Sequence, residues 1–230
     1  MNLTLPWLDP ASLDFPDPTS ALTNPNGLLA AGGNLSPARL LHAYQHGIFP
    51  WFSDGQPILW WSPDPRMVLF PAELHVSRTL AKTLRSGCFS FSSNQAFNEV
   101  LAGCAAPRHD SDGTWLDADM RQAYSELHGL GHAHSIETWQ DGALVGGLYG
   151  VALEGIFFGE SMFSRQKDAS KAAMATLVRA LIPAGYRLID CQVPNPHLAT
   201  MGARQIPRQD FMRYLPTATD ISRPAHWPVQ

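Results

Sequence analysis

The feature that most constrains the fold is a series of three apolar segments in the centre of the chain. They cover residues 133–139, 143–153 and 156–163, and the turns between them read Gln-Asp-Gly and Glu-Gly. Strand-like segments joined by such short turns are typical of antiparallel hairpins, so we predict a three-stranded meander. A helix expected at about 168–183 and a final strand at 187–193 complete an α+β fold with a mixed, mostly antiparallel sheet.

The first 65 residues differ in composition from the rest of the chain. They hold ten of the nineteen prolines and one arginine, but neither lysine nor glutamate. Such a shift indicates a domain boundary, so we predict a small N-terminal domain over 1–65 and a second domain over 66–230. One helix is expected in the first domain, with Ser36 as its N-cap, Pro37 at its first position and Gly47 after its end.

Three further helices are expected between the boundary and the meander. They cover residues 77–85, 94–104 and 117–130, and a strand is expected at 89–93. The second of these helices has Asn94 as its expected N-cap.

Composition and charge exclude several classes of protein. With 45% apolar and 16% charged residues, the chain is typical of a packed globular protein. The net charge of −4 argues against broad nucleic-acid binding, because phosphate contacts need clustered Lys and Arg. The opening segment lacks a basic region, and the longest apolar run is about half of the roughly 20 residues that a membrane helix needs. We therefore expect a cytoplasmic protein without a membrane partner.

No cofactor or metal is expected. The sequence contains no phosphate-binding loop, no G-x-S-x-G elbow and no dinucleotide fingerprint, so it does not support nucleotide hydrolysis or redox chemistry. The cysteines lack zinc-type spacing, and three nearby histidines straddle a glycine at a helix-to-strand junction. These residues are Cys88, Cys104 and Cys191, and His128, His132 and His134.

Two acids that stand among apolar neighbours are candidates for chemistry. Asp190 and Gln192 lie two apart in the expected last strand, so their side chains would point to the same face. Glu160 lies among aromatic and Met residues, which would suit a cavity that holds an amine or guanidinium beside an apolar side chain. Each acid also has a structural explanation, because Asp190 would cap the end of the strand and Glu160 would face water.

Several tryptophans occupy expected loops. Trp51, Trp60 and Trp61 lie in two Pro-containing segments, and Trp115 follows Asp-Gly-Thr. A loop tryptophan can stack on a nucleobase, which is worth about 1–3 kcal/mol per base, or it can anchor the loop to the core. Both explanations remain open.

Two groups of cations could contact phosphate. Arg78, Lys82 and Arg85 share one face of an expected helix, which would either follow a phosphate backbone or be solvated. A second group surrounds the start of the 168–183 helix, where the helix N-terminus favours anions. Its members are Arg165, Lys167 and Lys171.

Eight short motifs are distributed over roughly residues 20–214. They are NPNGLLAAGG from Asn24, LSPARLL from Leu35, AYQHGIFPWFS from Ala43, WWSPDPR from Trp60, GTW from Gly113, GHAHSIE from Gly131, GESMFSR from Gly159 and LIDCQV from Leu188. Together they resemble one family, the bacterial leucyl/phenylalanyl-tRNA–protein transferases. So many dispersed matches rich in Trp and Pro are not expected by chance.

The resemblance implies a fold and an activity. The fold is a small N-terminal domain followed by a GNAT-like acyltransferase domain. The activity is transfer of Leu or Phe, and also Met, from aminoacyl-tRNA to an acceptor protein that begins with Arg or Lys. The new peptide bond would mark the acceptor for degradation by the N-end rule.

Carried over by position, the resemblance also implies roles for single residues. The catalytic positions are Asp190, Gln192 and Glu160. The tRNA-binding face is expected to be Arg78, Lys82 and Arg85, which follows from their spacing on the expected helix and not from the carry-over. The substrate-binding positions are Trp51, Trp115, Leu148, Phe157, Met162, Leu177 and Asn195. Leu148 and Leu177 stand where Met and Phe are expected, so the preference among apolar donors is left open.

The implied reaction is aminolysis of an activated ester, in which the enzyme mainly positions two reactants. Our hypothesis is that Asp190, with Gln192, orients and deprotonates the acceptor α-amine, while Glu160 or Asp190 attracts its cationic side chain. Two other functions fit the expected fold: an acetyltransferase that uses acyl-CoA, and a non-catalytic adaptor for basic N-termini. The acetyltransferase has less support because no Gly-rich loop precedes the 168–183 helix.

Overall fold

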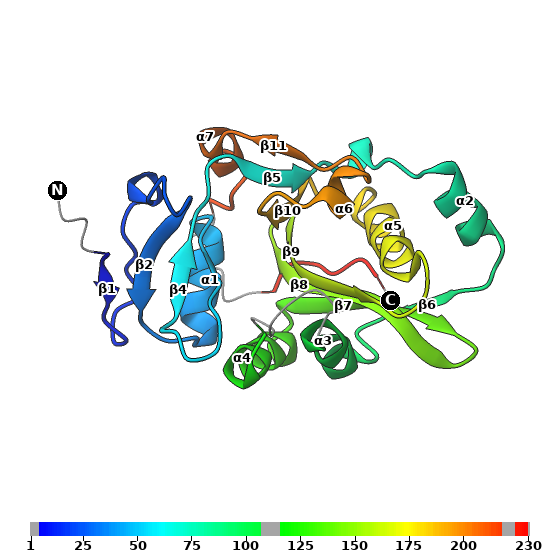
Figure 1. The fold of residues 1–230 in the computed structure, drawn as a ribbon, viewed down its shortest axis with the longest axis horizontal. Coiled ribbons are helices and arrows are strands. Elements are labelled where there is room, and N and C mark those ends of the chain that lie inside the picture. Colours follow the sequence, from blue (N-terminus) through cyan, green and yellow to red (C-terminus); the bar gives the residue numbers. More distant parts are fainter. Residues whose placement is uncertain (1–4, 107–115, 218–223, 230) are drawn as a thin grey trace.

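The computed structural model describes residues 5–106, 116–217 and 224–229, which form two β-sheets with helices packed on them (Figure 1). The smaller sheet comes from the N-terminal segment and has the strand order β1-β2-β4-β3. Its strands are β1 (Trp7–Leu8), β2 (Leu28–Gly32), β3 (Phe49–Pro50) and β4 (Leu59–Trp61).

The larger sheet has the strand order β11-β5-β10-β9-β8-β7-β6. Its strands are β5 (Arg66–Leu69), β6 (Ser90–Ser93), β7 (Ala133–Gln140), β8 (Ala143–Leu153), β9 (Ile156–Ser164), β10 (Leu188–Gln192) and β11 (Arg204–Ile206). β7, β8 and β9 pair antiparallel in succession, which confirms the expected meander. Its first turn holds Asp141 and Gly142 at φ 51° and 76°, the left-handed region that an Asp-Gly pair favours in hairpins.

β10 makes the sheet mixed, because it runs parallel to β9 and antiparallel to β5. The expected α+β fold with a mostly antiparallel sheet is therefore confirmed. The prediction that β10 is the last strand is wrong, since β11 follows it and pairs with β5 at the edge of the sheet. The three residues of β11 are too few to show the alternating pattern by which a strand is recognised.

Helices cover both faces of the larger sheet (Figure 1). On one face α5 (Ala169–Leu181) packs on β7, β8 and β9, and α2 (Arg78–Arg85) packs against α5. On the other face lie α3 (Phe97–Ala105) and α4 (Ala118–Gly129). The short α6 (Pro196–Ala199) and α7 (Arg208–Met212) follow β10 and β11. Within the described ranges, no helix has both the length and the apolar character needed to cross a membrane.

The predicted N-cap of α3 is wrong. The helix begins at Phe97, and Asn94 instead adopts φ 60° in the left-handed region. Its Oδ1 accepts a hydrogen bond of 3.0 Å from the Ser135 N–H, and its Nδ2 lies 3.0 Å from His134 Nδ1. The Asn94 side chain is thus committed to strand β7 and does not cap the helix.

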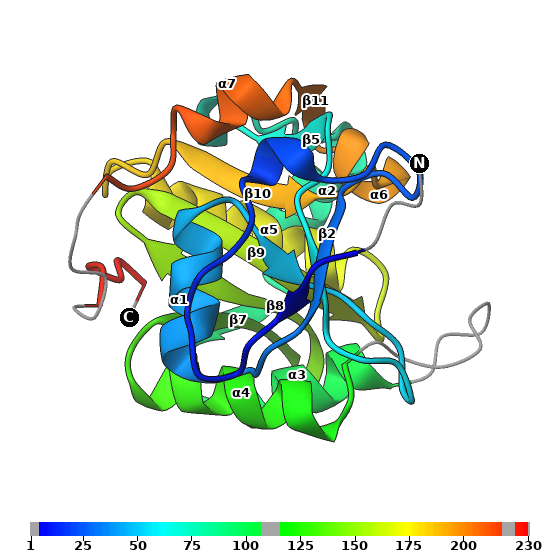
Figure 2. The same ribbon diagram turned by 90° about the vertical axis from the view of Figure 1, so that its left-hand side faces the viewer.

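The N-terminal segment shares a core with the larger sheet. Its helix α1 (Pro37–Gln45) begins as predicted, with the Ser36 hydroxyl accepting from the Arg39 N–H. Further along this helix, Tyr44 hydrogen-bonds to Tyr124 of α4 at 2.7 Å and packs near Phe158 of β9. Figure 1 shows α1 on the side of the smaller sheet that faces the larger one, and Figure 2 shows the lower end of α1 above α4. One apolar cluster of buried residues therefore extends through both parts.

The change of sheet falls between β4 and β5, which end and begin at Trp61 and Arg66. This position supports a division into domains 1–65 and 66–230. The division stays a prediction, because the shared core joins the two parts.

Candidate functional site

A cavity of about 800 Å³ opens where the N-terminal segment meets β8, β9 and β10. One part of its wall is apolar and includes Leu148, Phe157, Met162, Met174, Ile189 and Leu198. Another part is polar and includes Glu160, Arg165, Asp190, Gln192, Asn195 and His197. The cavity can therefore hold an apolar group beside a polar, reacting one.

A β-bulge in β9 places Glu160 at the wall of this cavity. Residues 149 and 150 of β8 pair with residues 161 and 159 of β9, so Glu160 is the extra residue of the bulge. Bulges re-aim side chains and are frequent beside active sites. The acid that looked anomalous in the sequence is half-buried and lines the cavity.

A second bulge lies beside it in β10. The register with β5 shifts between Asp190 and Gln192, and Gln192 adopts φ 58°. The regular alternation on which the expectation of a shared face rested is therefore interrupted, but both residues line the cavity. The two residues still meet, because the Gln192 N–H donates to Asp190 Oδ1 at 3.0 Å. A non-glycine residue in the left-handed region is strained, and such strain clusters at functional sites.

The carboxylate of Glu160 accepts hydrogen bonds from neighbouring side chains. Its Oε2 accepts from the Tyr124 hydroxyl at 2.6 Å, and its Oε1 accepts from Gln192 Nε2 at 3.2 Å. Burial raises the pKa of Glu160 to about 7, although hydrogen bonding to Tyr124 and Tyr44 opposes that shift. Close to neutral pH, Glu160 can therefore both accept and return a proton.

Asp190 is held in a buried ion pair that the sequence analysis did not anticipate. Arg66 donates to it twice, from Nε to Oδ1 at 2.8 Å and from Nη2 to Oδ2 at 2.6 Å, and both side chains are fully buried. The third guanidinium nitrogen donates to the Gly47 carbonyl at 3.1 Å. Both carboxylate oxygens of Asp190 are thus occupied by Arg66, and Oδ1 also anchors the backbone of Gln192.

Most of the expected substrate-binding residues lie around the cavity. Leu148, Phe157, Met162, Asn195 and Trp51 all line it. Trp51 is 41% exposed, and its backbone carbonyl accepts from Trp61 Nε1 at 2.6 Å. Leu177 of α5 differs, because its side chain is fully buried in the apolar core and does not line the cavity. Trp115 lies outside the described residues.

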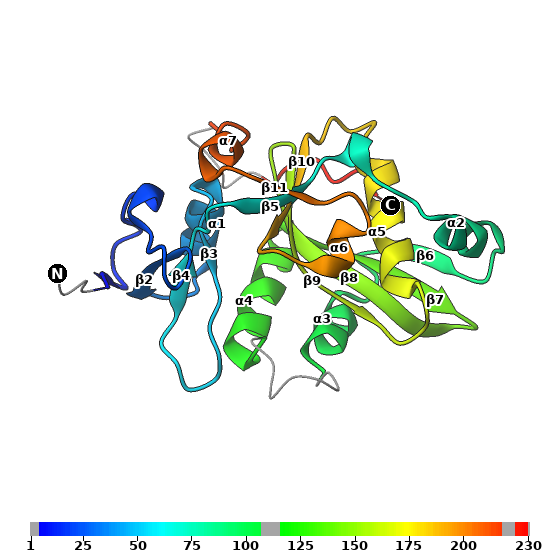
Figure 3. The same cartoon turned by 45° about the horizontal axis from the view of Figure 1, so that its top comes forward.

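The expected tRNA-binding face does not line the cavity. Arg78, Lys82 and Arg85 lie on α2, whose N-cap is the Ser77 hydroxyl. Figures 1 and 3 place α2 beyond α5, on the side away from the smaller sheet. Of the second cationic group, Arg165 lines the cavity, and its Nη1 donates to the Leu144 carbonyl at 3.1 Å.

Sequence reasoning missed four residues of the polar cluster. Arg66 closes the WWSPDPR motif, and the need of a buried acid for a cationic partner was the available signal for it. Tyr44, Tyr124 and Tyr149 surround Glu160, and burial raises the pKa of each of their hydroxyls. No sequence pattern connects them, because they come from α1, α4 and β8.

The histidines near the start of β7 lie in separate environments. His128 stacks on Phe97 at 4.0 Å between ring centroids, whereas His134 stacks on Trp227 at 4.1 Å. Across the described parts of the chain, no group of three His, Cys, Asp or Glu side chains is arranged to hold a metal ion.

Comparison with known proteins identifies the family. The family model described as leucyl/phenylalanyl-tRNA protein transferase matches residues 68–216, and the model of that family's N-terminal domain matches residues 33–64. A leucyl/phenylalanyl-tRNA–protein transferase of Pseudomonas syringae is 57% identical over 223 residues, covering 97% of both chains. Another from Nitrosospira multiformis is 60% identical over 211 residues, covering 92% of this chain and 90% of that protein.

Solved structures are more distant. A GCN5-related N-acetyltransferase from Kribbella flavida is 12% identical, with a TM-score of 0.37 over 71% of this chain and 58% of that one. A conserved protein of unknown function from Staphylococcus epidermidis is 11% identical, with a TM-score of 0.42 over 78% of this chain and 68% of that one. The match of the family model over more than half of the chain, together with relatives near 60% identity, is decisive: the chain belongs to the leucyl/phenylalanyl-tRNA–protein transferase family.

Proposed function

We propose that this chain transfers Leu, Phe or Met from aminoacyl-tRNA to the N-terminal Arg or Lys of acceptor proteins, and so creates an N-end rule degradation signal. The observation that carries the proposal is the cavity in which an apolar wall adjoins the Glu160–Gln192–Asp190 cluster. Charged tRNA is a cytoplasmic molecule, and we place the reaction in that compartment.

The apolar wall is the proposed donor pocket. Leu148, Phe157 and Met162 would contact the side chain of the transferred amino acid through their apolar surfaces. One methylene in such a pocket is worth only about 1–3 kcal/mol, so discrimination among Leu, Phe and Met should be loose. Val- and Ile-charged tRNAs should be poor donors, because a branch at Cβ would meet the wall of the pocket.

The polar wall is the proposed acceptor site. Among the described lining residues the acids are Glu160 and Asp190, and Arg66 neutralises the second of them. The ionised Glu160 therefore carries the uncompensated negative charge that would attract the cationic end of an acceptor beginning with Arg or Lys. Of the two acids, the arrangement favours Glu160 for that contact.

The geometry also favours Glu160 as the proton acceptor. The acceptor ammonium, with an ordinary pKa of about 7.7–8.0, would give a proton to Glu160, and the free amine would attack the ester carbonyl carbon. The second N–H of the Gln192 amide remains to stabilise the oxyanion that forms. The C–O bond to ribose then breaks, and Glu160 returns its proton to the leaving hydroxyl. The attacking nitrogen gives its second proton to the carboxylate so freed, which releases it to solvent. Arg66 and Asp190 would position Gln192 throughout.

The tRNA would be held at two further places. Trp51, exposed at the mouth of the cavity, and Trp115 would stack on the terminal adenosine, at about 1–3 kcal/mol per stacked base. The basic face of Arg78, Lys82 and Arg85 would contact phosphates without reading bases.

Transfer of radiolabelled Leu from tRNA to a peptide that begins with Arg tests the proposal. The wild-type chain should label this peptide and leave its N-acetylated form unlabelled. Glu160→Gln should lower kcat strongly, and Asp190→Ala should lower turnover far more than binding of charged tRNA. Labelling of the blocked peptide, or full activity of Glu160→Gln, would refute the assigned chemistry.

A further inference from the structure

The last described segment, residues 224–229, packs on the core behind the proposed donor pocket. Ala225, Trp227 and Val229 are partly buried against the apolar cluster on the α5 side of the larger sheet. The segment is red in Figure 1. It is also fixed by a hydrogen bond of 3.0 Å from the Tyr186 hydroxyl to the His226 carbonyl. The matched region of the family model ends at residue 216, before this segment begins.

Trp227 is held by a ring stack and a hydrogen bond. Its ring stacks on His134 with 4.1 Å between centroids and 2° between planes. Its Nε1 donates to the Ser93 hydroxyl at 2.9 Å, and that hydroxyl donates onward to the Ser135 carbonyl at 2.9 Å. Burial lowers the pKa of His134 to about 4, so this imidazole stays neutral at working pH and the stack carries no charge.

Phe157 lies between Trp227 and the cavity. Its ring centroid is 5.7 Å from that of Trp227, while the same side chain lines the cavity. The ring occupies the space left by Gly150, where an added Cβ would lie 2.6 Å from Phe157 Cζ. Gly150 and Trp227 therefore fix the position of the Phe157 ring from two directions.

We propose that Trp227 is a specificity-determining residue, which sets the depth of the donor pocket by holding the Phe157 ring in place. The inference rests on the proposed donor pocket. Protein interiors are close-packed, so removing the indole would leave a void into which the Phe157 ring can turn. The pocket would then deepen and accept larger donor side chains, while the acceptor site around Glu160 stays unchanged.

The test compares kcat/KM for leucyl-, phenylalanyl- and tryptophanyl-tRNA. Trp227→Ala should raise the Phe-to-Leu and Trp-to-Leu ratios at least about fivefold, a change within the range expected for reshaping an apolar pocket. Trp227→Phe should restore most of the wild-type ratio, and KM for the acceptor peptide should not change. If the alanine variant fails to fold, Trp227→Leu leaves a smaller void and must shift the ratios in the same direction.

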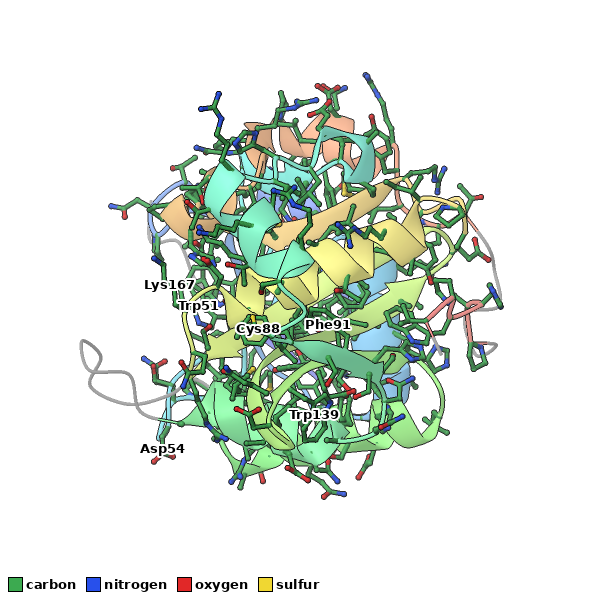
Figure 4. The ribbon with its side chains drawn as sticks, turned by 90° about the vertical axis from the view of Figure 1, so that its right-hand side faces the viewer. Trp51, Asp54, Cys88, Phe91, Trp139 and Lys167 are labelled. Atoms are coloured by element: carbon green, nitrogen blue, oxygen red, sulfur yellow. The ribbon has the colours of Figure 1, made fainter. Side chains whose placement is uncertain are left out.

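Trp139→Ala is the matched control. Trp139 Nε1 also donates to a serine hydroxyl, that of Ser92 at 2.7 Å, but its ring packs on the cluster of the opposite face. Figure 4 shows Trp139 and Phe91 on either side of the sheet edge, and Phe91 lies on the α5 side. Trp139→Ala should lose stability without changing the donor ratios.

A second variant tests the assignment of the donor pocket separately from the role of Trp227. Leu148→Ala enlarges the cavity directly and should change the donor ratios if the pocket is assigned correctly. Suppose that Leu148→Ala changes the donor ratios, whereas Trp227→Ala leaves them unchanged or lowers kcat/KM equally for all donors. That result would overturn the role of Trp227 alone. Unchanged ratios in both variants would overturn the donor pocket and this inference with it.

Discussion

The ion pair of Arg66 and Asp190 should act as a single structural unit. Removing one member leaves a buried charge uncompensated, so Arg66→Met should lower the free energy of unfolding by about 3–5 kcal/mol. The double variant Arg66→Met/Asp190→Leu should recover a large part of that loss, because no charge remains buried. Urea denaturation of the wild type and both variants measures these differences. A double variant no more stable than Arg66→Met would show that the pair is not coupled in this way.

The hydroxyl of Tyr124 should tune the proton affinity of Glu160. Its hydrogen bond lowers the pKa of Glu160, so Tyr124→Phe should raise that pKa above its present value of about 7. The proposed reaction needs the ionised carboxylate, so activity should be lost below this pKa and recovered above it. The rising limb of kcat/KM against pH should therefore move to higher pH in the variant.

The same acceptor peptide serves both proteins, so titration of its amine is common to the two profiles. Tyr214→Phe is the control, because Tyr214 packs against Phe70, and neither residue lines the cavity. If the rising limb of the pH profile does not move in Tyr124→Phe, Glu160 is excluded as the titrating base.

Among single residues, the sequence indicated the two acids of the site but not the side chains that bind them. Glu160 and Asp190 stood out because a carboxylate among apolar residues needs an explanation. Their partners Arg66, Tyr124 and Tyr44 lie far away in the chain, and only the assembled sheet and helices bring them together. We propose Glu160 rather than Asp190 as the base because Asp190 is paired with Arg66, and this ion pair could not be seen in the sequence.

The basic face of helix α2 should contribute to tRNA binding through charge alone. Substituting Glu for Arg78, Lys82 and Arg85 should raise KM for charged tRNA. The slope of log affinity against log salt concentration should become shallower by about 0.7–0.9 for each phosphate that the protein no longer neutralises. A small aminoacyl-adenosine donor should react as before, since α2 does not line the cavity. Arg121→Glu on α4 supplies a control at an exposed site on the opposite face. Equal losses with both donors would show that the face does not bind the tRNA body.

Regular elements with local signals were the easiest to predict. The meander and α1 follow from hairpin turns and from a Ser-Pro helix start, both of which depend on neighbouring residues only. The start of α3 was misplaced because Asn94 bonds to strand β7 instead of capping the helix. The bulges at Glu160 and Gln192 were also missed, because register shifts depend on the partner strand and leave no pattern in a single strand.

At the scale of the whole molecule, composition located a boundary but did not reveal the contact across it. The prolines and the lack of Lys and Glu distinguish residues 1–65, and the sheets do change near residue 65. Leu40 and Tyr44 of α1 are buried in the cluster that includes residues of the larger sheet. The periodicity of α1 predicts that this face is buried but not what covers it. The polar cluster depends on this contact, because Tyr44 reaches Tyr124 and Gly47 reaches Arg66.

The shared core predicts that the two parts unfold together. Leu40 of α1 is fully buried in the cluster that spans both parts, so Leu40→Ala should lower the free energy of unfolding by about 2–5 kcal/mol. Urea unfolding followed by tryptophan fluorescence and by far-ultraviolet circular dichroism should give one coincident transition, with a slope unchanged by the substitution. Leu13→Ala, at a position 41% exposed in the same segment, should change stability by less than about 0.5 kcal/mol. Two separate transitions would mean that the N-terminal segment is an independent domain, and that Tyr44 can leave the cluster around Glu160 while the larger sheet stays folded.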